Sequence, residues 1–140
     1  MNQRLPLVAC QKRLLTVWGV LGGLALAVVV FQVMPGGVYE AHRAEVLDWF
    51  LPTVVPTLTL MIGAVVALGM APDQSATVDG LTYRLALWLS VVYLVVVIVA
   101  LLMYAQSRSP VADLKGSAAV VAAIYSLVGI TLGAMFGTRK

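Results

Sequence analysis

Four long stretches of apolar residues run along the chain, at Leu14–Met34, Leu51–Ala71, Leu85–Ala105 and Ser117–Gly137. Each is about 20 residues long, the length that an α-helix needs to cross about 30 Å of hydrocarbon at 1.5 Å per residue. None of the four contains Asp, Glu, Lys, Arg or His. This pattern predicts an all-α membrane protein, a four-transmembrane-helix bundle that occupies residues 1–140 as a single domain.

The composition strengthens this prediction. Apolar residues make up 61% of the chain and charged residues 11%, and the mean hydropathy is +0.99. Soluble domains contain about 45–50% apolar and about 25% charged residues. A soluble fold of this length still leaves about a third of its surface in water, so it has no place to bury so much apolar surface. We expect the excess to face the lipid bilayer of a bacterial-type plasma membrane.

The first stretch follows basic residues, as the apolar core of a cleaved signal peptide also does. Its apolar run is too long for a signal peptide and no small-x-small cleavage site precedes Pro35, so we expect a retained span. The segment Leu7–Cys10 resembles a lipoprotein processing box, but too few residues precede it to form a targeting segment. We therefore expect Cys10 to be an ordinary cysteine at the membrane interface.

The distribution of Lys and Arg predicts the orientation, since cytoplasmic segments carry the excess of both. The side of the two tails and the middle loop holds Arg4, Lys12, Arg13, Arg84, Arg139 and Lys140. The opposite side holds only Arg43, Arg108 and Lys115. Both termini are therefore expected in the cytoplasm, an N-in and C-in arrangement. Aromatic residues are expected at the span ends, where amphipathic rings favour the interface: Trp18, Tyr39, Trp49, Tyr83, Trp88 and Tyr104.

The loops on the outer side are expected to be partly helical. Residues 38–49 are rich in helix formers and contain no proline, which predicts a helical extension of the second span or a short interfacial helix. Ser109 is a candidate N-cap before Pro110, so the last helix is expected to begin near Pro110, with Asp113 in its first turn. The carboxylates of the first outer loop would attract cations at a pore mouth, although we favour a solvated helix face: Glu40, Glu45 and Asp48.

The fourth span carries a stripe of small residues at steps of four and three, which keeps them on one helix face: Ala118, Ala122, Ser126, Gly129, Gly133 and Gly137. The first span carries a shorter version, Gly19 and Gly23, beside Gly22. Between helices in lipid there is no hydrophobic driving force, so close backbone approach through such residues is a main source of association. We favour packing within one bundle, and contact between protomers of a homo-oligomer is the alternative.

The second span begins with two prolines and three threonines, which make it a candidate pore or gate segment: Pro52, Thr53, Pro56, Thr57 and Thr59. Each proline inside a helix removes a backbone donor and leaves a carbonyl without its partner. Irregular backbone at membrane depth lies against protein or a water-filled cavity. We favour a helix that begins at Leu51, with Pro52 in its first turn, and a helix that begins before Asp48 is the alternative.

Chemical groups inside the spans are few. No ionisable residue lies within them, which argues against a proton relay or a coupling carboxylate. The chain has one histidine, His42, and one cysteine, Cys10, and no cluster with metal-site spacing, so we expect no catalytic residues, no metal and no cofactor. The net charge of +3 is spread over tails and loops, so nucleic acid is not an expected partner.

These observations indicate a protein that acts by assembling and is not an enzyme. The interpretation we favour is a homo-oligomeric passive channel or pore subunit, joined by the small-residue faces and with the Pro/Thr segment near the lumen. A membrane anchor or accessory subunit, with an unidentified membrane or cytoplasmic protein as its partner, is the alternative. A small uncoupled transporter is the third possibility.

Overall fold

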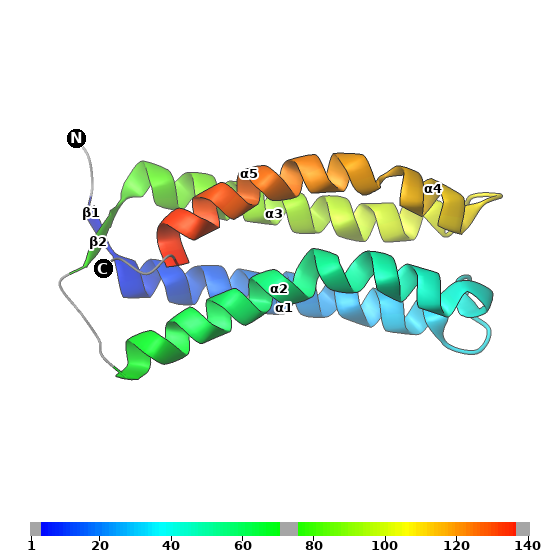
Figure 1. Ribbon diagram of the computed structural model, residues 1–140, viewed down its shortest axis with the longest axis horizontal. Helices are drawn as coiled ribbons and strands as arrows, with labels where there is room; N and C mark the ends of the chain where they lie inside the picture. Colours follow the sequence, from blue (N-terminus) through cyan, green and yellow to red (C-terminus); the bar gives the residue numbers. More distant parts are fainter. Residues whose placement is uncertain (1–3, 71–75, 137–140) are drawn as a thin grey trace.

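The structure is a computed structural model that describes residues 4–70 and 76–136. Its elements, in chain order, are β1 Arg4–Pro6, α1 Leu7–Val33, η1 Glu40–His42, α2 Arg43–Met70, β2 Thr77–Asp79, α3 Gly80–Tyr104, α4 Pro110–Gly116 and α5 Ala118–Phe136 (Figure 1). Four helical segments are long and apolar enough to cross a membrane: α1, the η1–α2 segment Glu40–Val66, α3 and α5. The prediction of a helical bundle with four apolar helices is therefore confirmed.

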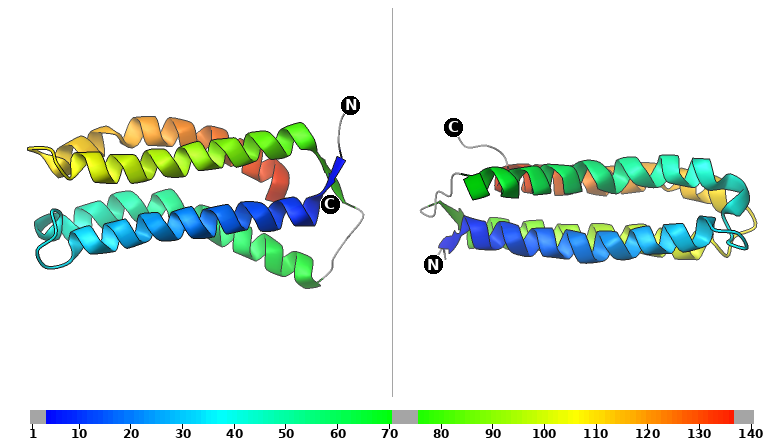
Figure 2. Two further views of the ribbon diagram at one scale, coloured as in Figure 1. Left: turned by 180° about the vertical axis from the view of Figure 1, so that it is seen from behind. Right: turned by 90° about the horizontal axis from the view of Figure 1, so that it is seen from below.

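The helices form two hairpins, α1–α2 and α3–α5, that lie side by side, and each hairpin contributes one helix to each of two layers. Figure 2 shows α1 and α3 in one layer and α2 and α5 in the other. Within its layer, α1 runs parallel to α3, and the short ribbon of β1 and β2 joins the starts of these two helices with Leu5 opposite Val78. The Gln11 side-chain amide donates a hydrogen bond of 2.6 Å to the carbonyl of Met135, so the end of α5 lies beside the start of α1.

The core follows one face of each helix, and the remaining faces are apolar and exposed. The largest fully buried side chains include Trp18, Tyr39, Phe50 and Tyr93. On the outside, the Phe31 side chain is 79% exposed, and many valines, leucines and isoleucines are exposed as well. Exposed apolar surface on this scale is not found on soluble monomers, and it suits contact with lipid.

The aromatic residues expected at the span ends differ in their exposure. Trp18, Tyr39 and Tyr83 are buried among the helices, and only Trp88 projects strongly outward. These rings offer more apolar area than any other side chain, so the bundle uses them as core.

The second span begins earlier than Leu51, so the favoured prediction for its start is wrong. Residues 40–42 form η1 and α2 starts at Arg43, as the predicted helical extension requires. The turn before η1 is held by Gly36, which has φ +86°, and whose N–H donates to the Glu40 carboxylate at 2.8 Å. Arg43 Nε also donates to the carbonyl of Val33 at 3.2 Å, which ties α2 to the end of α1.

The outer connection to the last span is a separate short helix. Pro110 occupies the first turn of α4 and Ser109 its N-cap position, as predicted, but the Ser109 side chain makes no capping hydrogen bond. Instead, the Ser107 hydroxyl donates to the Asp113 carboxylate. Ser117 separates α4 from α5, and its hydroxyl donates to the carbonyl of Leu114 at 2.6 Å.

Candidate functional site

Both prolines of the Pro/Thr segment lie inside α2. Since α2 begins at Arg43, the missing proline N–H groups remove the helical partners of the carbonyls four residues back, at Asp48 and Pro52. Threonine hydroxyls donate to nearby carbonyls: Thr53 to Trp49 at 2.6 Å, and Thr59 to Val55 at 2.9 Å. These two hydroxyls therefore serve the carbonyls of Trp49 and Val55, and not those of Asp48 and Pro52 that the prolines leave without helical partners.

The five residues of the Pro/Thr segment divide between two faces of α2. Thr57 is buried and Thr53 is half-buried, and both point into the bundle. Pro52, Pro56 and Thr59 are exposed on the outer face of the helix. A water-filled path past all five would therefore have to pass both sides of α2.

The inward side of this segment belongs to a buried cluster of hydroxyl and aromatic groups that sequence reasoning missed. The hydroxyls of Thr57 and Tyr125 lie 2.9 Å apart, and the Tyr93 hydroxyl donates to the carbonyl of Thr53 at 3.1 Å. The Tyr93 ring lies 5.9 Å from Trp18 and 5.5 Å from Tyr125, between ring centres. One aromatic or hydroxyl side chain from each of α1, α2, α3 and α5 thus meets in the middle of the bundle.

Two buried polar atoms in and near the cluster have no hydrogen-bond partner within the part of the chain that the structure describes. They are the Trp18 indole Nε1 and the Ser90 hydroxyl, one turn before Tyr93. Every member of the cluster is neutral, so it can donate and accept hydrogen bonds but holds no fixed charge for an ion. Its evident role is to join the four spans. The available sequence signal was a tyrosine in the middle of each of two apolar stretches, because a buried hydroxyl there requires a partner.

The small residues of α5 face outward. Ala118, Ala122, Ser126, Gly129 and Gly133 are all exposed, and Gly137 lies outside the described residues. A Cβ atom built on Gly129 or Gly133 would meet nothing within 4 Å. This face therefore does not make the contacts within the bundle that we favoured.

The glycines of α1 behave in two ways. Gly19 and Gly23 are exposed, and a Cβ atom on either would meet nothing within 4 Å. Gly22 is buried, and a Cβ atom there would lie 3.5 Å from the Val54 side chain of α2. Of these three glycines, Gly22 is therefore the one that lets α1 approach α2 closely, and Gly19 and Gly23 leave room for a partner outside the chain.

Two of the three acidic groups of the outer loop, Glu40 and Glu45, are engaged by the chain itself. Glu45 forms an ion pair with Lys115 of α4, and its other oxygen lies 3.1 Å from His42 Nδ1. Glu40 accepts the Gly36 N–H. Nearby, the Tyr39 hydroxyl donates to the carbonyl of Leu101 at 3.3 Å, and burial raises the pKa of this phenol above its ordinary value, so it remains a donor. These contacts fit a solvated helix end that ties α2 to α4.

Within residues 4–70 and 76–136, no group of three His, Cys, Asp or Glu side chains is arranged to hold a metal ion. Cys10, in the first turn of α1, is a free thiol and is buried. No protein-family model, no curated protein and no solved structure matches this chain. The residues and their placement therefore carry the functional argument alone.

Proposed function

We propose that this protein is a subunit of a homo-oligomeric passive membrane channel, with its termini in the cytoplasm of a bacterial-type cell. The observation that carries the proposal is the outward small-residue face of α5, where Gly129 and Gly133 have open space beyond them. In lipid, small residues have no reason to gather on one exposed face unless another backbone approaches there. A second helix against this face would gain van der Waals contact that lipid chains fit less closely.

A second exposed small face, Gly19 and Gly23 of α1, favours a ring. The two faces lie at similar depths along the bundle. Gln11 and Met135 lie at one level, because a hydrogen bond joins them. Gly19 is about 12 Å from that level along α1, and Gly129 is about 9 Å from it along α5. Two different faces that pack against each other make a head-to-tail interface, and such interfaces close into rings when the rotation allows.

The position of α2 decides which helix would face the lumen. It packs between α1 and α5, so neighbours bound to those two helices would lie on either side of it. Of the four candidate spans α2 has the lowest mean hydropathy and α3, on the opposite corner, the highest. We therefore place α3 toward lipid and the exposed Pro52, Pro56 and Thr59 toward the lumen.

The oligomeric state tests the proposal directly. The purified protein in lipid nanodiscs is expected to give a ring in cryo-EM class averages and a multiple of the 14.9 kDa mass by mass photometry. Gly129→Leu combined with Gly133→Leu should dissociate it, because the new side chains hold the partner backbone away. Val92→Leu, at an exposed position on α3, is the matched control and should leave the assembly intact. A strictly monomeric wild-type particle would remove the pore proposal.

Conductance in planar bilayers tests the place of α2. Thr59→Val should change single-channel conductance, since its exposed hydroxyl would line the lumen. Thr16→Val is the matched control, because Thr16 is also exposed and bonds the carbonyl four residues back at 2.9 Å, as Thr59 does. Equal conductance in wild type and Thr59→Val would move α2 out of the lumen.

The alternative function is that of a membrane anchor or accessory subunit. It is favoured by the buried cluster of Trp18, Tyr93 and Tyr125, which fills the middle of the bundle with side chains. In that case the outward face of α5 would receive a helix of another protein. Purification in mild detergent would then return a second protein in fixed stoichiometry, and Gly129→Leu with Gly133→Leu would release it.

A further inference from the structure

The exposed face of α2 carries a carboxylate in line with the two prolines and Thr59. Asp48 is exposed and lies one helical turn before Pro52, which itself lies one turn before Pro56. Thr59 follows about three full turns after Asp48, so it returns to the same side of the helix. These four exposed residues form a strip about 16 Å long, and we call it the α2 strip.

The polar groups of the α2 strip are hydrogen-bond acceptors. The ionised Asp48 carboxylate has no hydrogen to donate. The carbonyls of Asp48 and Pro52 lack their helical partners, because Pro52 and Pro56 have no N–H. The hydroxyl of Thr59 already donates to the carbonyl of Val55 at 2.9 Å. The strip therefore offers oxygen lone pairs and no free polar hydrogen, which suits a cation and not an anion.

The charged residues near Asp48 are directed to other parts of the bundle. Glu45 forms an ion pair with Lys115 of α4 and also lies 3.1 Å from His42 Nδ1. Arg43 comes five residues before Asp48, about 140° around the helix, and its Nε donates to a carbonyl at the end of α1. Asp48 itself forms no ion pair within residues 4–70 and 76–136. The α2 strip therefore carries a net negative charge.

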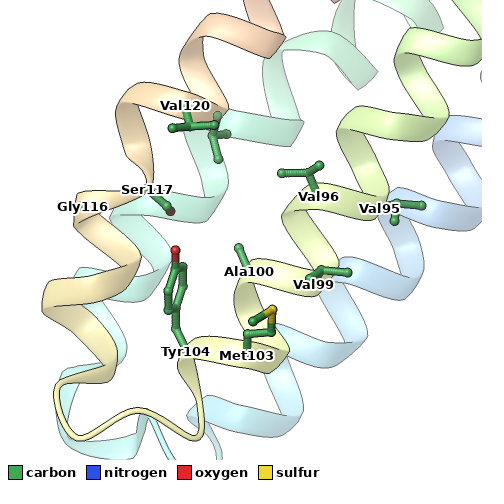
Figure 3. Close-up of a pocket in the computed structure, with 10 residues that line it drawn as sticks. Val95, Val96, Val99, Ala100, Met103, Tyr104, Gly116, Ser117 and Val120 are labelled. Carbon is green, nitrogen blue, oxygen red and sulfur yellow. The ribbon is translucent and has the colours of Figure 1, made fainter.

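A groove on the other hairpin offers an ion no comparable groups. It lies between α3 and the junction of α4 and α5, and its walls are mainly apolar (Figure 3). None of the residues that line it is charged, and its polar side chains are those of Tyr104 and Ser117. The Ser117 hydroxyl already donates to the carbonyl of Leu114. An ion in this groove would lose water without gaining a charged partner, so the α2 strip is the better route.

We propose that the channel conducts cations in preference to anions and that Asp48 sets this preference. The inference rests on the proposed channel, since Asp48 lies at the lumen only if α2 does. In a ring, each protomer contributes one Asp48 carboxylate to the outer mouth, and a ring of carboxylates attracts cations and repels anions. The carbonyls freed by the prolines are costly against lipid tails, whereas water or a cation in a lumen satisfies them.

Reversal potentials in planar bilayers under a KCl gradient test the proposal. The wild type is expected to pass K⁺ in preference to Cl⁻ by on the order of fivefold, which corresponds to about 1 kcal/mol, the attraction of two unit charges about 4 Å apart in water. Asp48→Asn keeps the shape of the side chain and removes its charge, so the permeability ratio should fall close to one. Asp48→Glu restores a carboxylate and should keep the preference.

Asp113→Asn is the matched control. Asp113 is also an exposed carboxylate, and α4 lies at the same end of the bundle as the start of α2 (Figure 1). This variant should have the permeability ratio of the wild type. Equal ratios in wild type and Asp48→Asn, a wild type that prefers Cl⁻, or an equal loss in Asp113→Asn would each overturn the inference and leave the channel in place.

Mass photometry separates the remaining outcomes. Asp48→Asn should form particles of the wild-type mass, and smaller particles would overturn the inference because Asp48 would then serve assembly. A wild type that is monomeric and carries no current would instead refute the channel itself, and the cation preference with it.

Discussion

At the scale of single residues, hydrogen bonds inside the bundle are the clearest link between sequence and stability. The pair Thr57 and Tyr125 joins α2 to α5, and Tyr93 joins α3 to the backbone of α2 at Thr53. In membranes such bonds contribute on average about 0.6 kcal/mol and at most about 1.7 kcal/mol, because the unfolded chain in lipid also finds partners. Each bond is thus a modest contribution to stability and a strong constraint on which helices meet.

A double-mutant cycle should measure the first of these bonds. Thr57→Val, Tyr125→Phe and the double variant are compared by unfolding in mixed micelles of increasing SDS. We expect a coupling energy of about 0.5–1.5 kcal/mol, since each single change removes one partner of the 2.9 Å contact. A coupling energy near zero would mean that the two hydroxyls do not interact in the folded protein.

Replacement of Ser90, in contrast, is not expected to destabilise the protein. Its buried hydroxyl has no partner among the described residues, so Ser90→Ala removes a desolvated polar group and no hydrogen bond. The free energy of unfolding should stay the same or rise by up to about 1 kcal/mol. Ser126→Ala serves as a control, since that hydroxyl is exposed and bonds the carbonyl of Ala123 at 2.7 Å. A loss above about 1 kcal/mol in Ser90→Ala would reveal a buried partner.

At the scale of elements, the sequence predicted the number and the apolar character of the spans better than their ends and faces. Charge-free stretches identify a span because an ionised group in hydrocarbon is costly and therefore rare. The start of α2 was misplaced because a proline early in an apolar run is expected at a first turn, whereas the polar residues from Arg43 onward extend the same helix outward. The direction of the α5 stripe was not predictable, since periodicity shows that residues share a face but not what that face meets.

Replacement of Pro52 measures how much a proline inside α2 costs in stability. Its side chain is exposed, so Pro52→Ala sacrifices little packing and restores an N–H for the carbonyl of Asp48. We expect the variant to be more stable by about 1 kcal/mol, the usual net value of a hydrogen bond. Hydrogen exchange should also show a protected amide at the new alanine. A less stable variant would indicate that the backbone conformation imposed by Pro52 is itself needed for packing.

At the scale of the whole molecule, the proposed self-association would use the outward faces of α1 and α5. In a ring, the α1 face of one protomer meets the α5 face of the next; in a two-fold dimer, each face meets its own copy. The single native thiol, Cys10, is replaced by alanine so that only introduced cysteines react. The pairs of introduced cysteines that form disulfides then show which faces of neighbouring copies are in contact.

Gly19→Cys and Gly129→Cys distinguish the two arrangements. In a ring, oxidation of the double variant in membranes should give a ladder of covalent multimers, whereas each single variant should remain a monomer on denaturing gels. A dimer from Gly129→Cys alone would instead indicate a two-fold contact through α5. No crosslink in any of the three variants would contradict self-association through these faces.

The β1–β2 ribbon also affects the order in which the parts of the chain can assemble during synthesis. Leu5 pairs with Val78, so the strand at the start of the chain has no partner until about 70 further residues have been made. At about 5–20 residues per second, translation imposes a wait of roughly 4–14 s. During that interval α1 and α2 exist without α3, and the Trp18 ring lacks its neighbour Tyr93. The first hairpin is therefore the part of this protein most open to capture by an insertase, a protease or a second nascent copy.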